Sequence, residues 1–259
     1  MDNRGWRFID TGERSGAYNM ALDESLARGL AEGAGSPTLR VFRWKPWAVS
    51  VGYNQGTGEL DHSRCAADGM DIVRRPTGGR AILHAEELTY SVVMYAGGRS
   101  ILQAYNDIGA ALVRGLSLYG VDVSLQKSQP DLREQYRSRS SIPCFSSSAR
   151  YEIEWGGRKL VGSAQRRFTG RGGDVLLQHG SILCGPAHRA LAEYLSVAEG
   201  GTLERIRRTL REKTADLGGI TGRAVDIGRL AGCIRRGFEE EWGFTFHEDA
   251  PVDHHPQQA

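Results

Sequence analysis

The sequence predicts an α/β protein of the α+β type, in which helices flank a mixed, largely antiparallel sheet. Two observations lead to this fold class: strand patterns outnumber helix patterns, and tight turns join several neighbouring strands. The composition is that of an ordinary globular protein, with 40% hydrophobic and 25% charged residues. The 259 residues suffice for one large domain. We expect that domain over residues 1–248, followed by a polar, disordered tail over 249–259.

Three segments have the periodicity of amphipathic helices. Ser15 is a candidate N-cap, and leucines at positions 22, 26 and 30 follow it at intervals of four. Apolar residues then step by three and four from Ile101 to Leu116, and Gly120 ends that helix. A third amphipathic pattern covers residues 227–242.

Short runs rich in β-branched and aromatic residues predict the strands. They lie at residues 38–42, 48–52, 71–74, 88–94, 121–125, 151–155, 159–166 and 175–183. Gly156 and Gly157 lie between two of these runs and predict a hairpin turn.

Charge and hydropathy exclude several classes of protein. With 33 Lys and Arg against 31 Asp and Glu, the net charge of +2 is too small for a dedicated nucleic-acid binder. No apolar run approaches the roughly 18–20 residues of a membrane span, and the N-terminus lacks the apolar region of a secretory signal. We therefore expect a cytoplasmic protein that binds neither nucleic acid nor membrane.

The first cluster of chemistry-bearing residues runs from Arg74 to His84 and contains the adjacent glycines Gly78 and Gly79. Such a pair permits positive φ values and lets backbone N–H groups approach a ligand closely. The flanking arginines suit an anionic or carbonyl-bearing ligand, and His84 can donate a hydrogen bond into the same pocket. The alternative is a simple hairpin with solvated arginines and a histidine bonded within the protein.

Two later strands carry polar residues in unusual positions. In residues 157–167, the side chains of Lys159, Ser163 and Gln165 share one face of the predicted strand, and Gly162 on the other face leaves room for a ligand. The alternative is an exposed edge strand. In residues 177–183, a His-Gly-Ser patch interrupts an apolar strand, which predicts a β-bulge beside a functional site.

Four cysteines lie far apart, without the spacing of a metal site, so we expect no bound metal and no disulfide. Cys184 and Cys233 have apolar neighbours, whereas Cys144 lies on a polar, proline-anchored loop. Only four basic residues are lysines, and one of them, Lys159, follows Cys144 across the predicted hairpin. A nearby ammonium lowers a thiol pKa from about 8.5 into the range of about 3.5–7.5, so Cys144 is a candidate nucleophile; the alternative is a structural cysteine.

Five ordered motifs together resemble the lipoate/biotin protein ligase superfamily over roughly residues 5–245. The motifs are Tyr18–Glu24, Ser50–Gln55, Arg74–His84, Lys159–Gln165 and Gln178–Ser181. The resemblance implies that residues 1–248 form a catalytic domain with a fold related to class II aminoacyl-tRNA synthetases and biotin synthetases. Members of this superfamily move an acyl group onto one lysine of a carrier domain.

The Pro143-Cys144-Phe145 segment ahead of Lys159 resembles, more narrowly, the octanoyltransferase branch of that superfamily. This implies that Cys144 carries an octanoyl thioester, that Lys159 lowers its pKa, and that the reaction needs no cofactor. The donor would be octanoyl-acyl carrier protein, and the acceptor a lipoyl domain of a 2-oxoacid dehydrogenase or a glycine cleavage carrier protein. The acyl tunnel would be lined by Arg75, Gly78, Gly79, His84, Gly162, Ser163 and Gly180.

Two positions depart from the superfamily pattern. Arg80 stands where ligases usually have a third glycine, which favours the transferase branch. Ala85 follows His84 where an aspartate is common, which leaves the orientation of His84 open. The alternatives are an ATP-dependent lipoate ligase, an octanoyl amidotransferase acting between carrier domains, and a non-catalytic carrier-binding protein.

Overall fold

The computed structural model describes residues 5–126, 152–196 and 200–248. Its centre is an eight-stranded sheet. In spatial order the strands are β11 (His247–Glu248), β1 (Arg7–Arg14), β2 (Thr38–Trp44), β6 (Glu87–Tyr95), β10 (Gly173–Leu183), β9 (Arg158–Gly170), β8 (Ile153–Trp155) and β7 (Ser124–Leu125). The pairs from β2 to β7 are antiparallel, while β1 runs parallel to both of its neighbours. The predicted fold class is confirmed.

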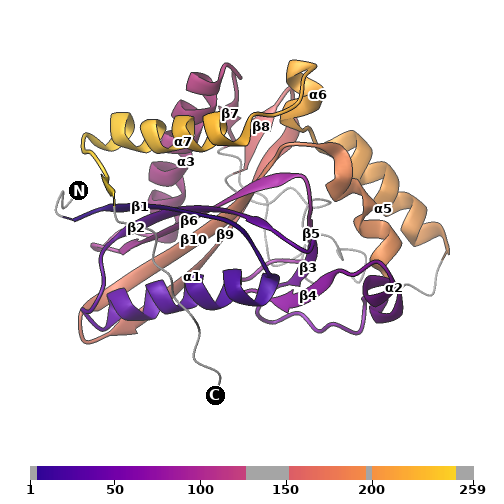
Figure 1. The fold of residues 1–259 in the computed structure, drawn as a ribbon, viewed down its shortest axis with the longest axis horizontal. Helices are drawn as coiled ribbons and strands as arrows, with labels where there is room; N and C mark the ends of the chain where they lie inside the picture. The colour runs from indigo at the N-terminus through magenta and orange to yellow at the C-terminus, as the bar shows by residue number, and fades with distance from the viewer. Residues whose placement is uncertain (1–4, 127–151, 197–199, 249–259) are drawn as a thin grey trace.

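A small three-stranded sheet lies beside one end of the large one (Figure 1). Its strands, in spatial order, are β4 (Asp71–Arg74), β3 (Ala48–Val51) and β5 (Ile82–His84). The pair β3–β4 is parallel and the pair β3–β5 is antiparallel.

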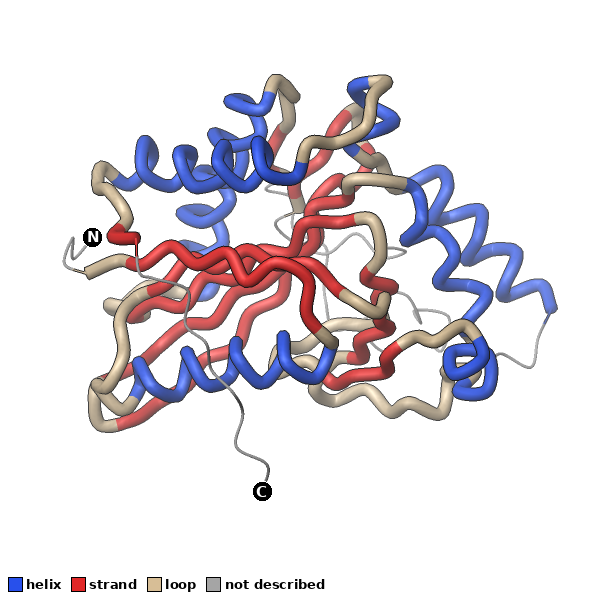
Figure 2. Tube along the Cα trace, viewed as in Figure 1, coloured by secondary structure: helices blue, strands red, loops and turns tan. Residues whose placement is uncertain are grey.

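Helices cover both faces of the large sheet, and further helices flank the small one (Figure 2). They are α1 (Gly16–Ala31), α2 (His62–Ala67), α3 (Ile101–Tyr119), the 3₁₀ helix η2 (Pro186–Tyr194), α5 (Gly200–Lys213), α6 (Leu217–Thr221) and α7 (Ile227–Trp242). Helix α1 lies on one face, while α3 and α7 lie on the other (Figure 1). No helix within the described ranges is long and apolar enough to cross a membrane.

The central strands are buried on both faces because each face has its own helix layer. Along β6, Val93 packs with Leu30 of α1, whereas Val92 and Met94 belong to the larger core that includes residues of α3 and α7. Alternate side chains point to opposite faces of a strand, so these strands read as nearly continuous apolar runs. This layering holds the inner strands in a fixed register.

The three predicted helices are confirmed, and so are the two predicted helix ends. The Ser15 hydroxyl accepts a hydrogen bond from the Tyr18 amide, and Gly120 ends α3 with a left-handed φ of 100°. The strand predicted at 121–125 is shorter than expected. The Val121 amide donates to the Leu116 carbonyl, so the start of that segment closes the end of the helix.

Several elements were not predicted, namely β1, β5, β11, α2, η2, α5 and α6. Strand β1 (RFIDTGER) has only two apolar side chains and depends on pairing with β2 and β11. The predicted tail at 249–259 lies outside the described residues.

Candidate active site

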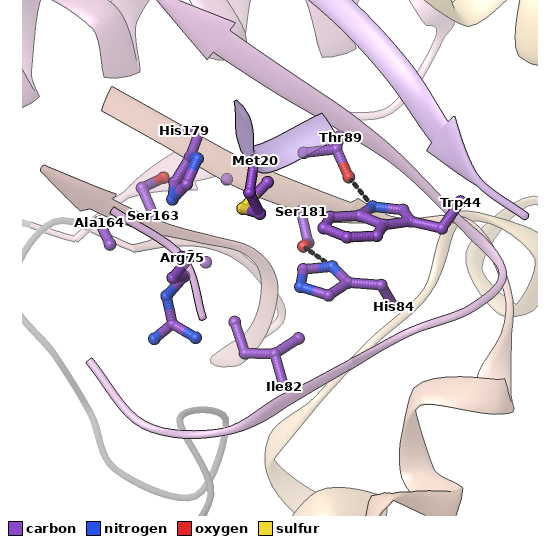
Figure 3. A pocket seen from close by; sticks show the side chains of 12 residues that line it. Met20, Trp44, Arg75, Ile82, His84, Thr89, Ser163, Ala164, His179 and Ser181 are labelled. Carbon is purple, nitrogen blue, oxygen red and sulfur yellow. Dashed lines mark hydrogen bonds between the residues drawn. The ribbon is translucent and has the colours of Figure 1, made fainter. Parts of the chain in front are cut away.

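A pocket opens where the two sheets meet, and helix α1 contributes Met20 to its wall (Figure 3). The space inside it, including its open mouth, is about 380 Å³. Its lining residues are Met20, Trp44, Arg75, Ile82, His84, Thr89, Gly162, Ser163, Ala164, His179, Gly180 and Ser181.

Five of the residues predicted to bind substrate line this pocket: Arg75, His84, Gly162, Ser163 and Gly180. Gly78 and Gly79 lie in the adjacent β4–β5 loop and do not belong to the described lining. Lys159 is also absent from that lining, although it lies on β9, the strand that supplies Gly162 and Ser163. Cys144 lies outside the described residues.

Both ring nitrogens of His84 bond to side chains behind the pocket wall. Nδ1 pairs with Glu87 Oε1 at 2.9 Å and Nε2 with Ser50 Oγ at 2.7 Å. The ring stacks on Trp44, with a centroid separation of 3.9 Å. Glu87, three residues further along, therefore orients His84 in place of the aspartate expected at position 85. The alternative of an internally bonded histidine is confirmed, yet this histidine still lines the pocket.

His179 occupies a second carboxylate–imidazole–hydroxyl chain. Its Nδ1 lies 3.0 Å from Asp23 Oδ2, and its Nε2 lies 2.6 Å from Thr77 Oγ1. Burial lowers the pKa of His179, and the Asp23 carboxylate only partly opposes this. Burial pushes the pKa of Asp23 upward, but the charge of Arg40 and the hydrogen bond from His179 outweigh it, so that pKa lies below its ordinary value. The imidazole is therefore neutral: it donates from Nδ1 and accepts the Thr77 hydroxyl proton at Nε2.

Arg40 of β2 binds Asp23, the carboxylate end of this series of hydrogen bonds. It is fully buried; its Nη1 lies 2.8 Å from Asp23 Oδ1 and its Nη2 lies 2.5 Å from Asn19 Oδ1. Asn19 and Asp23 are four residues apart on α1, so they present adjacent polar groups to the sheet. A buried charge requires such a set of partners.

Ser163 is held from behind by Tyr90 of β6. Their hydroxyl oxygens are 2.7 Å apart, and burial raises the pKa of Tyr90 to about 12. The facing residue on β10 is Gly180, where a Cβ would approach the Gly162 carbonyl oxygen to 2.4 Å and the Tyr90 ring to 2.7 Å. Only glycine allows these strands and the tyrosine to pack at this distance.

The pocket thus presents almost entirely carbon to a ligand, although half of its lining residues are polar types. The hydroxyls and imidazole nitrogens of those residues bond to one another and to buried carboxylates behind the wall. A polar group satisfied in this way contributes its carbon atoms to the pocket surface at little desolvation cost. The arrangement favours an apolar chain as the occupant.

Arg75 supports the loop between β4 and β5, which contains Gly78 and Gly79 and is called the glycine loop below. Its side chain does not remain in solvent. It is buried, and its donors form five hydrogen bonds, to Ser50 O, Ser50 Oγ, Gly78 O (twice) and Arg80 O. The alternative of solvated arginines is therefore wrong for this residue. Gly79 has a φ of +95°. A Cβ on Gly52 would come within 2.0 Å of the Gly79 carbonyl oxygen. This contact accounts for a glycine at position 52.

Two expectations about the strands are corrected. The register of β10 with β6 and β9 is continuous through His179, so no bulge lies at the His-Gly-Ser patch. The bulge is in β9. The adjacent residues Ile153 and Glu154 of β8 pair with Val161 and Lys159 of β9, so one extra residue of β9 lies between the two pairs. Lys159 is not on an exposed edge either: it is buried and pairs with the carboxylate of Glu152.

The three described cysteines, Cys65, Cys184 and Cys233, are buried and free. Burial raises the pKa of Cys184 to about 12. Among the described residues, therefore, no cysteine is exposed.

Four residues that hold the two histidines have no role predicted from the sequence, namely Asp23, Ser50, Thr77 and Glu87. The available signal was a polar residue on a helix face that is otherwise apolar, as at Asn19 and Asp23 beside Met20 and Ala27 of α1. Ser50 and Thr77 lie inside two of the motifs quoted above, but a single hydroxyl in a strand or loop is common and does not by itself indicate a histidine partner.

Comparison with known proteins connects this site to one family. Residues 15–239 match the model of the lipoyl protein ligase A/B catalytic domain. The chain is 40% identical to octanoyltransferase LipM of Kyrpidia tusciae, over 92% of this chain and 87% of that protein. It is 34% identical to octanoyltransferase LipM of Clostridioides difficile, over 97% of this chain and 92% of that protein.

Solved structures share the fold. A bipartite lipoate protein ligase from Thermoplasma acidophilum superposes with a TM-score of 0.75 at 24% identity, covering 96% of this chain and 88% of that one. A lipoate-protein ligase A crystallised with ATP gives a TM-score of 0.73 at 25% identity, covering 96% and 90%.

Replacing the buried Asp23 with asparagine is expected to lower the free energy of unfolding by about 3–5 kcal/mol, because the Arg40 charge then remains buried without a carboxylate. The matched control is Glu24→Gln, one residue away, where a solvent-exposed pair with Arg28 is lost and about 0.5 kcal/mol or less is expected. Urea denaturation of both variants measures the difference. Equal destabilisation by the two substitutions would contradict the assignment.

The free energy of unfolding is expected to fall as the pH drops below about 6.5, because the unfolded chain then binds a proton that folded, neutral His179 does not. His179→Gln should make this dependence less steep. Urea denaturation at pH 7 and pH 5 gives the two slopes. Burial also lowers the pKa of His188 to about 4, so part of the slope persists in His179→Gln. Identical slopes in that variant and the unmodified protein would show that His179 takes up protons equally in both states.

Proposed function

This chain belongs to the lipoyl protein ligase A/B catalytic-domain family, and we propose that it transfers an octanoyl group from acyl carrier protein to a lysine of a lipoyl domain. The observation that carries this proposal is the pocket of carbon surface built from polar residues. Relatives named octanoyltransferase, 34–40% identical over most of the chain, support the same substrate. The acceptors would be lipoyl domains of 2-oxoacid dehydrogenases or the glycine cleavage carrier protein, and the reaction would take place in the cytoplasm.

In the proposed reaction the Cys144 thiolate attacks the carbonyl carbon of the octanoyl thioester. The carbon–sulfur bond to the carrier breaks, the carrier thiolate takes up a proton, and octanoyl-Cys144 remains. The ε-amine of the acceptor lysine then attacks that thioester, its extra proton is released, and the Cys144 thiolate leaves. An amide replaces a thioester, so the proposed chemistry requires no nucleotide or metal.

Strand β9 runs from Lys159, where the thioester would react, to the pocket that would hold the acyl chain. Lys159 stands at its beginning, and Gly162, Ser163 and Ala164 line the pocket further along. Lys159 and Ser163 are four residues apart on this strand. In the proposal, the thioester lies at the Lys159 end and the methyl end lies in the pocket beside Met20, Trp44 and Ile82.

The proposed roles of the glycine loop differ from those of the lining residues. Arg75 fixes the carbonyl groups of Gly78 and Arg80, so Gly78 and Gly79 would meet the substrate through their backbone while Arg75 acts by holding them. His84, Gly162, Ser163 and Gly180 would contact the acyl chain directly, as expected for residues of the pocket wall.

An ATP-dependent lipoate ligase is the second candidate, favoured by the structural likeness to a lipoate-protein ligase A crystallised with ATP. The two candidates differ in what they consume. A ligase would need free acid, ATP and Mg²⁺, and an octanoyltransferase only the acyl-carrier thioester.

Transfer from octanoyl-acyl carrier protein to a lipoyl domain is expected to proceed in EDTA after enzymatic removal of ATP. The acceptor should gain one octanoyl group on its target lysine, observed by intact mass. The matched reaction contains free lipoate, ATP and Mg²⁺ without the acyl carrier protein, and should yield no modified acceptor. A strict requirement for ATP and Mg²⁺ would instead support the ligase.

A covalent octanoyl adduct at Cys144 is expected when the protein is incubated with octanoyl-acyl carrier protein alone. Hydroxylamine should remove it, because it cleaves thioesters, and Cys144→Ala should abolish both the adduct and turnover. Cys233→Ala, at one of the buried cysteines, serves as the matched control and should retain both. An adduct that maps to Cys65, Cys184 or Cys233, or product formed without any adduct, would overturn the acyl-cysteine mechanism.

A further inference from the structure

The ammonium of Lys159 is engaged by a carboxylate. Lys159 pairs with Glu152, the residue that immediately precedes β8, and each side chain is only 5% exposed. Removing two charges from water is costly, and their mutual attraction offsets that cost only where the geometry is well fixed. The orientation of the lysine is therefore tied to the position of Glu152.

The backbones of both residues are anchored on separate parts of the fold. The Lys159 carbonyl accepts a hydrogen bond of 2.9 Å from the Ala215 amide between α5 and α6, and the Glu152 carbonyl accepts one of 2.8 Å from Gln126. The bulge in β9 comes directly after Lys159, and bulges re-aim the side chains beside them. These constraints direct the lysine towards Glu152.

The charged or titratable groups at or beside the backbone partners of Lys159 (Glu154, Thr214 and Ala215) have partners of their own. Glu154, opposite Lys159 in the β8–β9 register, accepts from the Gln126 side chain at 3.2 Å. On the helical side, His188 bonds to the Thr214 hydroxyl at 2.7 Å, and Asp216 pairs with Arg189 at 3.0 Å. In the described part of the chain, Glu152 is the carboxylate in contact with the ammonium.

We propose that Glu152 is a positioning residue for Lys159: its carboxylate keeps the lysine a fixed ammonium, which acts in acyl transfer as a positive charge and not as the base that removes the acceptor's proton. An opposite charge in contact favours the charged form of a lysine. A neutral amine at this place would in addition leave the Glu152 carboxylate buried opposite an uncharged group. The role in transfer rests on the proposed octanoyltransferase function.

The first test measures the charge of Lys159 directly and does not depend on activity. The chain contains only four lysines, at positions 45, 127, 159 and 213, so ¹³C-lysine labelling gives few Cε signals, and Lys159→Arg identifies that of Lys159. In the unmodified protein and in the control Glu154→Gln, this signal should keep the shift of a charged amine up to about pH 10. In Glu152→Gln its titration should move to lower pH by about one unit or more. An unchanged titration in Glu152→Gln would overturn the proposal.

The second test follows octanoyl transfer from pH 6 to pH 10 in the same proteins. Glu152→Gln should lower kcat about tenfold at pH 7, shift the alkaline loss of activity to lower pH, and change KM by less than about twofold. Glu154→Gln should match the unmodified protein. A kcat that rises at neutral pH in Glu152→Gln would overturn the proposal, because the neutral amine would then be the active form.

Two further results keep the outcomes separate. If circular dichroism shows that Glu152→Gln does not fold, Glu152→Asp replaces it, because aspartate retains the charge. In Glu152→Asp, kcat should fall while the alkaline loss of activity stays at the same pH. A shift of that loss to another pH would overturn the proposal. If the unmodified protein transfers no octanoyl group, the proposed function fails, whereas the lysine titration still decides the Glu152 assignment.

Discussion

The buried contact between Arg40 and Asp23 joins helix α1 to the central sheet, and the organisation of the pocket depends on it. Arg40 is fully buried on β2 and is satisfied by two side chains and one carbonyl of α1 together with Thr11. Such a charge tolerates only one placement of the helix, since any shift leaves the guanidinium without partners. That placement puts Met20 into the pocket and Asp23 under His179.

Asp23 also fixes the pocket wall and the glycine loop, through hydrogen bonds. Asp23 orients His179, whose far nitrogen accepts from Thr77 at the start of the loop. On the other side of the pocket, Glu87 orients His84, whose far nitrogen meets Ser50, a partner of Arg75. Two carboxylate–imidazole–hydroxyl chains therefore fix the same loop from two directions. Both ring nitrogens of each histidine are hydrogen-bonded, which fixes the two rings. A fixed wall lets a site hold one substrate geometry.

The same networks explain how polar residues produce an apolar cavity. A leucine-lined pocket would also exclude water, but its side chains would not be fixed by directional bonds. Here the hydroxyls and imidazoles are held by hydrogen bonds behind the wall and turn carbon towards the occupant. For a flexible acyl chain, which has no polar group to orient, the position of the wall is the main source of specificity.

The sequence by itself determined the fold class, the three amphipathic helices, the helix ends at Ser15 and Gly120, and most inner strands, because amphipathic periodicity and capping are local properties. The resemblance of its motifs to a known superfamily also implied that Arg75, His84, Gly162, Ser163 and Gly180 lie together. Only the tertiary structure decided what those side chains do. Three of the partners of His84 and His179 come from β3, α1 and the glycine loop, and contacts between segments so distant in sequence have no local signature. The fourth, Glu87, is three residues from His84. Polarity in the sequence predicted a polar site, whereas the direction of each polar bond, set by burial and by the register of β9 and β10, produced an apolar one.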